Sequence, residues 1–374
     1  MLTEVSRRQD FPGLSDIHYL NTAAESIPPL CVGEALQAYW RDKQLGMQGR
    51  EPHFATWVAC QEIAAQSIGL ANDEVAFCSC SSEAYNLLGS ALQLQAADEV
   101  VINDLDFPAG ATPWLTQHPQ PNIRLWSSRS GRLDLEDLRP LLSARTRLVQ
   151  TSLISFFNGF RLDWPAFIST VRERAPDAIV AVDITQALGR IPIALPGADI
   201  LISSTHKWSL GIHGGCIIGI PKASAARLTT SAGGWYHLSN AFDDDRFTTA
   251  KIKTGAASFS VGMPNFAAIY ALNAALRYLQ AIGQERIAAQ ADPLVAHLDG
   301  HLRERGLTPL APYSPNLPTG IVAFRHPRST EIHGALLSAG VHIMHHAGRL
   351  RVAIHGYNTA DDINHLLDVL RRFN

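Results

Sequence analysis

Short apolar segments alternate with amphipathic ones through the middle of the chain. The apolar segments are rich in β-branched residues, which is typical of buried strands, and they cover residues 74–79, 99–103, 123–126, 147–153, 178–183, 199–203 and 215–220. Apolar residues at three- and four-residue steps predict helices over 82–94, 135–142 and 164–174. This alternation predicts an α/β domain in which helices cover both faces of a mainly parallel, seven-stranded sheet.

The pattern changes after residue 264. An Ala-rich helical stretch is predicted over 264–282, and a second helix is predicted to follow it to about residue 305. Strand-like IVAFRH, helix-like TEIHGALLSAG, strand-like RLRVAIHGY and a helix from Asp361, capped by Thr359, predict a small C-terminal α+β domain. We therefore divide the chain into an N-terminal segment (1–30), a large domain (31–283) and a small domain (284–374). The N-terminal segment is expected to be extended and to lie against the large domain.

Composition and charge limit the partners. With 31 Lys and Arg against 34 Asp and Glu, the net charge is −3, so no nucleic-acid or membrane partner is expected. The N-terminus lacks a signal-like apolar run and no stretch approaches a membrane span, which predicts a cytoplasmic protein. The five cysteines are expected to be reduced, and because the Cys78-Ser-Cys80 pair has no second Cys/His pair at zinc-finger spacing, no metal is predicted.

Three places carry candidate chemistry at the ends of predicted strands. Lys207 follows one strand and suits a reactive amine, although a solvated surface lysine has the same pattern. Asp183 ends another and would need a cationic partner such as a protonated pyridine nitrogen, although a helix or turn cap is an alternative. Ser81 and Ser82 begin a helix and suit a phosphate, although Glu83 also permits a capping box. Taken together, these features describe a pyridoxal 5'-phosphate (PLP) site.

Over nearly its whole length, from 19–24 (YLNTAA) to 351–359 (RVAIHGYNT), the chain resembles the class V aminotransferase superfamily, which includes cysteine desulfurases and isopenicillin-N-epimerase-like proteins. The resemblance implies a fold type I PLP-dependent transferase with a small-molecule amino-acid substrate. It also implies a homodimer with active sites at the subunit interface.

The resemblance assigns roles around the cofactor ring. Lys207 matches the lysine that forms a Schiff base with PLP, and Asp183 matches the partner of the pyridine nitrogen. Gln186 matches the donor to the ring hydroxyl, and Phe107 matches the aromatic residue that stacks on the ring. Arg351 matches the arginine that holds the α-carboxylate of the substrate, a role that suits a planar, bidentate donor.

Other positions match contacts to the cofactor phosphate. Ser81 and Ser82 match the hydroxyl residues of the phosphate cup, and Ser204 and His206 match two further phosphate contacts. The segment 259–265 (FSVGMPN) resembles a stretch that reaches the phosphate of the neighbouring subunit. Since methionine at position 263 cannot donate a hydrogen bond, that contact would have to come from a backbone amide such as that of Gly262.

Five residues are candidates for choosing the reaction from the mouth of the pocket: Glu25, His53, Trp235, Tyr236 and His237. Glu25 and His53 are predicted to bind substrate. For each of the five, an ordinary loop residue is the alternative.

One absence separates this chain from the desulfurases it resembles. Those enzymes take sulfur as a persulfide on a cysteine in the C-terminal part of the chain, and here no cysteine follows Cys216. The predicted reaction is therefore β-elimination by a C–S lyase acting on cysteine or an S-substituted cysteine. An aminotransferase or amino-acid epimerase on the same scaffold is the alternative, and a non-catalytic binding protein would not need Lys207, Asp183 and Arg351 together.

Overall fold

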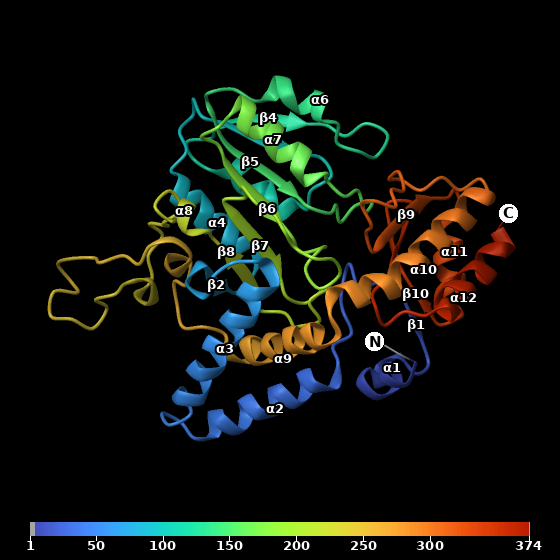
Figure 1. The fold of residues 1–374 in the computed structure, drawn as a ribbon, viewed down its shortest axis with the longest axis horizontal. Helices are drawn as coiled ribbons and strands as arrows, with labels where there is room; N and C mark the ends of the chain where they lie inside the picture. Colours follow the sequence, from blue (N-terminus) through green and yellow to red (C-terminus); the bar gives the residue numbers. More distant parts are fainter. Residues whose placement is uncertain (1–3, 374) are drawn as a thin grey trace.

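The computed structural model describes residues 4–373, and its centre is a seven-stranded sheet (Figure 1). The strand order is β2-β8-β7-β6-β5-β3-β4, and β8 is antiparallel to both of its neighbours while the other pairs are parallel. The strands are β2 (Val75–Cys78), β3 (Glu99–Asn103), β4 (Asn122–Trp126), β5 (Thr146–Ser152), β6 (Ile179–Asp183), β7 (Ile200–Ser204) and β8 (Cys216–Gly219). The predicted α/β architecture is confirmed.

Helices cover both faces of this sheet. On one face lie α3 (Arg50–Ile68), α7 (Trp164–Arg174) and α9 (Phe266–Ile282), with α2 (Leu30–Gln44) packed on α9, and on the other lie α4 (Ser81–Leu92) and α5 (Thr112–Thr116). Val180 and Val182 of β6 face the first layer, whereas Ile179 and Ala181 face the second. Because both faces are buried at the middle of the sheet, β6 and β8 are apolar along almost their whole length, whereas the edge strand β4 is partly exposed. Short helices α6 (Leu135–Leu138) and α8 (Lys222–Ala225) lie in the connections.

The C-terminal part forms a second, smaller core around a three-stranded antiparallel sheet of order β11-β12-β9. Its strands are β9 (Ile321–Arg325), β11 (Met344–His346) and β12 (Arg349–Ala353), and its helices are α10 (Gln284–Glu304), α11 (Ser329–Ser338) and α12 (Ala360–Leu370). The predicted cap of the last helix is present, since the Thr359 side chain accepts a hydrogen bond from the backbone of Asp362. No helix in the described part of the chain is both long and apolar enough to cross a bilayer.

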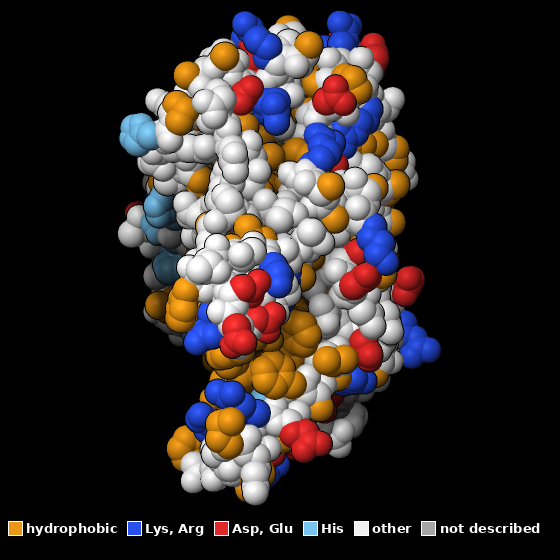
Figure 2. All heavy atoms as spheres, turned by 90° about the vertical axis from the view of Figure 1, so that its left-hand side faces the viewer, with side chains coloured by type: hydrophobic (Ala, Val, Ile, Leu, Met, Phe, Trp, Pro, Cys, Tyr) orange, Lys and Arg blue, Asp and Glu red, His pale blue; other side chains and the backbone are white. Residues whose placement is uncertain are grey.

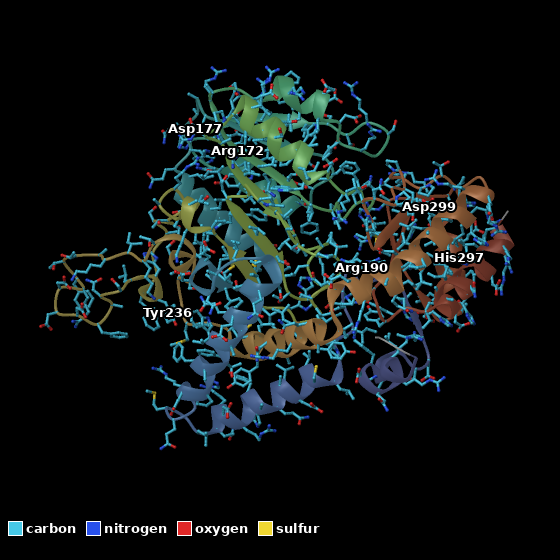
Figure 3. The ribbon with its side chains drawn as sticks, viewed as in Figure 1. Arg172, Asp177, Arg190, Tyr236, His297 and Asp299 are labelled. Atoms are coloured by element: carbon cyan, nitrogen blue, oxygen red, sulfur yellow. The ribbon has the colours of Figure 1, made fainter. Side chains whose placement is uncertain are left out.

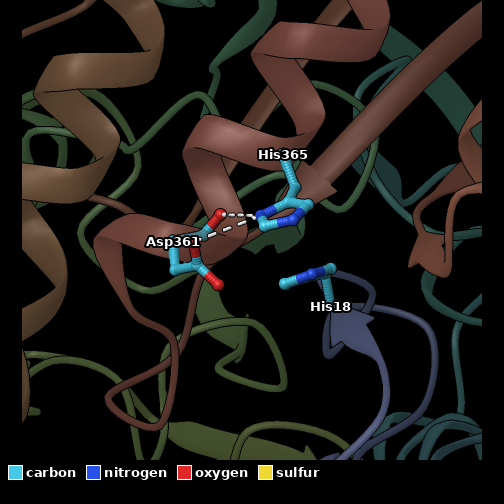
Figure 4. Close-up of side chains that lie close together, drawn as sticks. All are labelled: His18, Asp361 and His365. Carbon is cyan, nitrogen blue, oxygen red and sulfur yellow. Dashed lines mark hydrogen bonds and ion pairs between the residues drawn. The ribbon is translucent and has the colours of Figure 1, made fainter.

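Phe11 and Leu14 of the N-terminal segment pack into the core of the large domain, as expected, but the segment is not extended throughout and it also contacts the small domain. It contains a helix, α1 (Glu4–Asp10), and its strand β1 (His18–Tyr19) pairs in parallel with β10 (Val341–His342) of the small domain. The cause is a buried acid on α12, because Asp362 lies 2.8 Å from His18 Nδ1. The ring of His18 also stacks on His365, at 4.0 Å between centroids, beside Asp361 (Figure 4).

A buried ion pair joins the large domain to α10 at the junction of the two domains (Figure 3). Arg190 is fully buried, and it donates to Asp292 Oδ1 at 2.6 Å and to the backbone oxygen of Ile354 at 3.0 Å. Helices α9 and α10 meet at Gly283, whose φ of 88° suits glycine. These contacts hold β12 beside the loop that follows β5, where Arg351 reaches the backbone of Phe156.

Candidate active site

The carboxyl ends of β6 and β7 bring the first two candidate residues together. Asp183 ends β6, and β7 ends at Ser204, three residues before Lys207. Thr185 ties the two ends: its backbone N–H donates to Asp183 Oδ1 at 2.8 Å, and its hydroxyl accepts from the Ser204 N–H at 3.0 Å. The crevice beyond the carboxyl ends of parallel strands is where α/β domains bind ligands.

Asp183 lies at one end of a line of buried polar side chains. The Tyr85 hydroxyl donates to Asp183 Oδ2 at 3.2 Å and accepts from Gln150 Nε2 at 3.1 Å. Burial, followed by the charge of Asp183, raises the pKa of Tyr85 well above its ordinary value, so the phenol keeps its proton. Asp183 is 9% exposed and retains lone pairs for one more donor.

Lys207 presents an amine with no hydrogen bond or ion pair to any residue that the structure describes. Its Nζ lies 5.2 Å from the centroid of the Phe107 ring. Burial lowers the pKa of Lys207, and Arg351 lowers it further, while Asp183 and Glu25 act in the opposite direction. A lysine with a lowered pKa is a better nucleophile and base at neutral pH.

The N-terminus of α4 offers free donors beside the strand ends. Within the described chain, the hydroxyls of Ser81 and Ser82 have no hydrogen-bond partner, and Cys80 at the N-cap makes no side-chain cap. Glu83 takes part in a cap of another kind, because its carboxylate accepts from the backbone and hydroxyl of Ser79 at 2.7 and 2.5 Å. The hydroxyls and amides of the first turn therefore remain available to a phosphate.

His206 and a histidine that the sequence analysis missed lie next to Lys207. The rings of His206 and His213 stack at 4.2 Å, and His213 Nε2 lies 3.2 Å from Glu25 Oε2. Burial, then the charges of Lys207 and His213, lower the pKa of His206 to about 4, so its ring is neutral at physiological pH. Glu25 is thus brought to the Lys207 side of the site, as predicted for a residue at the pocket mouth.

Gln186 is buried and already engaged. Its Oε1 accepts from Trp208 Nε1 at 2.6 Å, and its Nε2 donates to the backbone oxygen of Ala23 at 3.1 Å. A primary amide has two N–H groups, so one hydrogen remains for a cofactor hydroxyl.

Arg351 stands on the opposite, small-domain side of the crevice. It is 2% exposed, and its Nη1 donates to the backbone oxygen of Phe156 at 2.7 Å, whereas its buried Nε has no partner among the described residues. Phe156 meets Phe107 edge to face at 5.0 Å. Burial, then the charge of Arg349, lower the pKa of Arg351 to about 10, which leaves the guanidinium charged at neutral pH.

Some predicted residues are not brought to this group within the single chain. His53 is buried among the rings of α2 and α9, with Nδ1 3.2 Å from the Tyr270 hydroxyl and its ring stacked on Phe266 at 5.0 Å. Gly262 is exposed. Tyr236 lies at the base of a projecting segment (Figure 3), in the short helix Trp235–His237.

Besides His213, three residues of the site escaped the sequence analysis although their spacing points to them. Tyr85 lies four residues after Ser81, one helical turn on, and Arg349 lies two residues before Arg351 on the same face of a strand. Asp106 precedes Phe107; its Oδ1 accepts from the Ser152 backbone at 2.8 Å and its buried Oδ2 has no partner in the described chain. Burial raises the pKa of Asp106 to about 7. The hydrogen bond from Ser152 acts in the opposite direction, and the charge of Asp183 raises the pKa further.

The residues present fit PLP. An unpartnered lysine amine with a lowered pKa suits its aldehyde, and a buried carboxylate with spare lone pairs suits its ring nitrogen. A half-exposed phenylalanine ring beside the amine suits its ring face, and a helix N-terminus with two free hydroxyls suits its phosphate.

Comparison with known proteins places the chain among enzymes of this kind. Residues 18–366 match the profile of the family described as Aminotransferase class-V. The uncharacterized aminotransferase YcbU of Bacillus subtilis (strain 168) is 31% identical over 365 residues, which cover 96% of this chain and 95% of that protein.

Two solved structures share the fold. The apo cysteine desulfurase of Thermococcus onnurineus NA1 superposes with a TM-score of 0.87 at 22% identity, covering 100% of this chain and 98% of that chain. The cystine C–S lyase C-DES, in complex with its reaction product cysteine persulfide, has a TM-score of 0.85 at 19% identity and covers 96% of this chain and 98% of that chain. Another C-DES structure holds glycine covalently linked to its PLP cofactor.

Proposed function

The chain belongs to the class V aminotransferase family, and from this premise we propose that it is a lyase that breaks the β C–S bond of cysteine or an S-substituted cysteine. Proteins of this family depend on PLP, and the chain is a fold type I PLP enzyme, as the sequence analysis predicted. The lyase assignment is the finer step, and the following observations support it.

The observation that carries the proposal is the tight turn before Arg351. Strands β11 and β12 are joined by Ala347 and Gly348 alone, both with left-handed φ of 51° and 71°. The turn leaves no loop here to carry a nucleophilic cysteine, and no cysteine follows Cys216 in the sequence. An enzyme of this fold without such a cysteine has no protein group in this region to accept sulfur, so we infer that the sulfur-containing group leaves as a free thiol or persulfide.

The roles of the chain's own residues follow from their positions. Arg351 binds the α-carboxylate and fixes the amino acid against the Phe107 side of the crevice. Asp183, held by Tyr85 and Thr185, keeps a proton on the cofactor nitrogen. PLP supplies the electron withdrawal that makes the α C–H bond acidic. Lys207 Nζ accepts the α-proton as general base.

The remaining steps break one bond and need no oxidant. As the α-proton moves to Lys207 Nζ, the β C–S bond breaks and its electron pair leaves with sulfur. The neutral His206 and the His213 ring stacked on it lie on the Lys207 side of the site and could supply an N–H to the departing sulfur. Water then hydrolyses the three-carbon fragment to pyruvate and ammonia.

An aminotransferase is the second candidate. Its support is the 31% identity to YcbU, which is named an aminotransferase. Such an enzyme would return the α-proton to a different atom and would need a keto acid as acceptor, whereas an epimerase would return it to the opposite face of the α-carbon.

We further propose that two copies of the chain form a cytoplasmic homodimer. Large apolar side chains are exposed, among them Met47 (71%), Phe242 (83%) and Phe247 (87%). Figure 2 shows hydrophobic side chains gathered in the lower half of one face of the molecule. Gly262 and Met263 are also exposed, so the Gly262 amide is free to reach a neighbouring subunit's phosphate. Sedimentation at the 40.7 kDa mass of one chain would contradict this proposal.

The reaction is tested by incubating the PLP-loaded enzyme with a panel of cysteine S-conjugates in deuterated buffer and analysing the products by mass spectrometry. A lyase releases pyruvate and ammonia without any added keto acid. Lys207→Ala should lower this rate by about 1,000-fold or more, because it removes the general base and the cofactor attachment. Lys222→Ala is the matched control, since Lys222 is an exposed partner of Asp73.

One outcome would overturn the lyase, and another would overturn the role of Lys207. If the substrate comes back intact but deuterated at the α-carbon, the site activates amino acids without eliminating sulfur. If pyruvate forms equally fast in Lys207→Ala, the assignment of the base is wrong.

A further inference from the structure

Strand β12 alternates between two environments. Leu350, Val352 and Ile354 face the core of the small domain, whereas Ala353 faces the core of the large domain. Because side chains alternate along a strand, Arg349 and Arg351 share the face that is turned to the large domain. Arg351 shows this directly, since it reaches the backbone of Phe156.

The same face of the small sheet is basic. Arg349 pairs in register with Arg325 of β9 and with His346 of β11. No ion pair joins Arg325, Arg349 or Arg351 to a carboxylate of the described chain. One side of the crevice therefore carries three guanidinium groups with no acid to balance them.

Burial makes this imbalance significant at Arg349. Three arginines in the described residues are fully buried, namely Arg190, Arg349 and Arg351, and only Arg190 has a carboxylate partner. Arg349 is 2% exposed, and its Nε and Nη1 have no hydrogen-bond partner in the described chain. Its guanidinium instead lies 3.9 Å from the centroid of the Phe157 ring.

A buried cation without an anion is unfavourable, so proteins keep one where a ligand supplies the anion. For Arg351, the α-carboxylate of the substrate does so under the proposed function. Arg349 is as buried and less well bonded, and nothing in the reaction described so far uses its charge.

We propose that Arg349 binds a second anionic group, at the end of the substrate's side chain, so that the enzyme selects amino acids that carry an acidic side chain or S-substituent. This inference rests on the proposed role of Arg351 as the α-carboxylate site. A planar guanidinium with two free N–H groups matches a carboxylate in a bidentate arrangement.

The spacing sets the size of the substrate. Residues two apart on a strand are separated by about 6–7 Å, so the two anionic groups of the ligand should lie a similar distance apart. An S-carboxymethyl group on cysteine, or a longer acidic S-substituent, spans that distance. The rings of Phe156 and Phe157 lie 5.9 and 3.9 Å from the Arg349 guanidinium, and Arg351 donates to the backbone oxygen of Phe156, so these two residues would enclose the chain between the two acids.

The test compares two ligands of nearly equal shape, S-carboxymethylcysteine and its uncharged amide S-carbamidomethylcysteine. Half-saturation of the PLP-loaded enzyme is followed by the cofactor absorbance. We expect the wild type to bind the acid about 10- to 100-fold more tightly. Arg349→Gln should abolish that preference and leave binding of the amide unchanged.

The matched control is Arg325→Gln, which removes the same charge from the neighbouring strand, where Arg325 is exposed and bonded to the backbone of Ala347. It should keep the preference for the acid. If both variants lose it equally, the preference comes from the general field of the basic face and the proposed contact is wrong.

Two further readouts do not depend on turnover. Calorimetry should show adipate, whose carboxyl carbons are five bonds apart as in S-carboxymethylcysteine, binding better than its monoamide to the wild type but not to Arg349→Gln. Thermal unfolding should show Arg349→Gln no less stable than the wild type, because an unpaired buried charge is removed. A marked loss of stability would give Arg349 a structural role and overturn the proposal. If Arg349→Gln does not fold, Arg349→Lys is the alternative variant. It keeps the positive charge but loses the planar, bidentate donor, so it should reduce the preference for the acid.

The outcomes separate this inference from the lyase assignment. Preference for the acid without pyruvate would reject the lyase and keep the anion site. Pyruvate formed equally well from acid and amide would keep the lyase and reject the anion site.

Discussion

The two sides of the crevice treat buried charge in opposite ways. On the large-domain side, Asp183 accepts hydrogen bonds from Tyr85 and Thr185, and at the domain junction Arg190 is paired with Asp292. On the small-domain side, Arg349 and Arg351 are buried without a carboxylate partner among the described residues. This difference indicates that buried charges with partners in the chain stabilise the fold and the cofactor end of the site. The buried arginines without a carboxylate partner indicate where, under the proposed function, an anionic group of the substrate binds.

The sharpest test of this comparison exchanges one arginine of each kind for glutamine. Arg190→Gln should lower the free energy of unfolding by about 3 kcal/mol, because it leaves Asp292 without its partner. This value is at the low end of the range for a buried ion pair, since the Asp292 side chain is 31% exposed. Arg351→Gln should leave that free energy unchanged or raise it. It should lower kcat/KM by about 100-fold or more, since the α-carboxylate loses its partner.

Denaturant unfolding and steady-state kinetics of the two variants give the measurements. If Arg351→Gln were as destabilising as Arg190→Gln, then Arg351 would be part of the fold, and the contrast between the two sides of the crevice would disappear.

Asp106 is an exception on the large-domain side, and pH dependence tests it. Burial raises the pKa of Asp106 to about 7 from its ordinary 3.8. The folded protein therefore binds more protons than the unfolded chain between about pH 4 and 7, so the stability that protonated Asp106 provides is lost as the pH rises through that window. Each pH unit corresponds to about 1.4 kcal/mol, so the rise in pKa from 3.8 to about 7 predicts a relative change of about 4 kcal/mol.

The isosteric variant Asp106→Asn should lack this decline, so its stability relative to the wild type should improve between pH 4 and 8. Unfolding measured across that range checks the expectation. Parallel curves for the two proteins would mean that Asp106 is ionised with an ordinary pKa in the folded state.

Much of the fold could be predicted from the sequence because buried strands and amphipathic helices leave periodic patterns. Every predicted strand of the large sheet is present, and each begins and ends within one residue of the predicted position. Helix α7 has the predicted bounds. The contact of the N-terminal segment with the small domain was not predicted, because its partners there, such as Asp362, are more than 300 residues away in the chain and no local pattern indicates them. Helices α2 and α3 were not singled out at all.

The sequence places Lys207 and Asp183 at or just after the ends of two strands, and the structure brings both to the same edge of the sheet, whereas their roles stay predictions. Tyr85 was missed because a tyrosine at this position of α4 has the pattern of an ordinary core residue. Only the register of β5 and β6 in the structure shows that its hydroxyl lies between Gln150 and Asp183. Arg349 was missed because a strand arginine has many uses, and only the lack of a carboxylate around it makes it unusual.

The smallest expected effect comes from the hydrogen bond that completes the paired side of the comparison. Tyr85→Phe removes the donor to Asp183 Oδ2 and leaves Gln150 Nε2 without that acceptor. A hydrogen bond from a neutral donor to a charged acceptor contributes about 1–2 kcal/mol, so kcat should fall by about 10-fold. KM should change little, because under the proposed function the substrate contacts Arg351 and not Tyr85. A pH titration of the cofactor absorbance should also shift, since Asp183 loses a donor that favours its charged form. An unshifted titration with an unchanged kcat would mean that Tyr85 only fills space. The position of Asp183 would then depend on Thr185 alone.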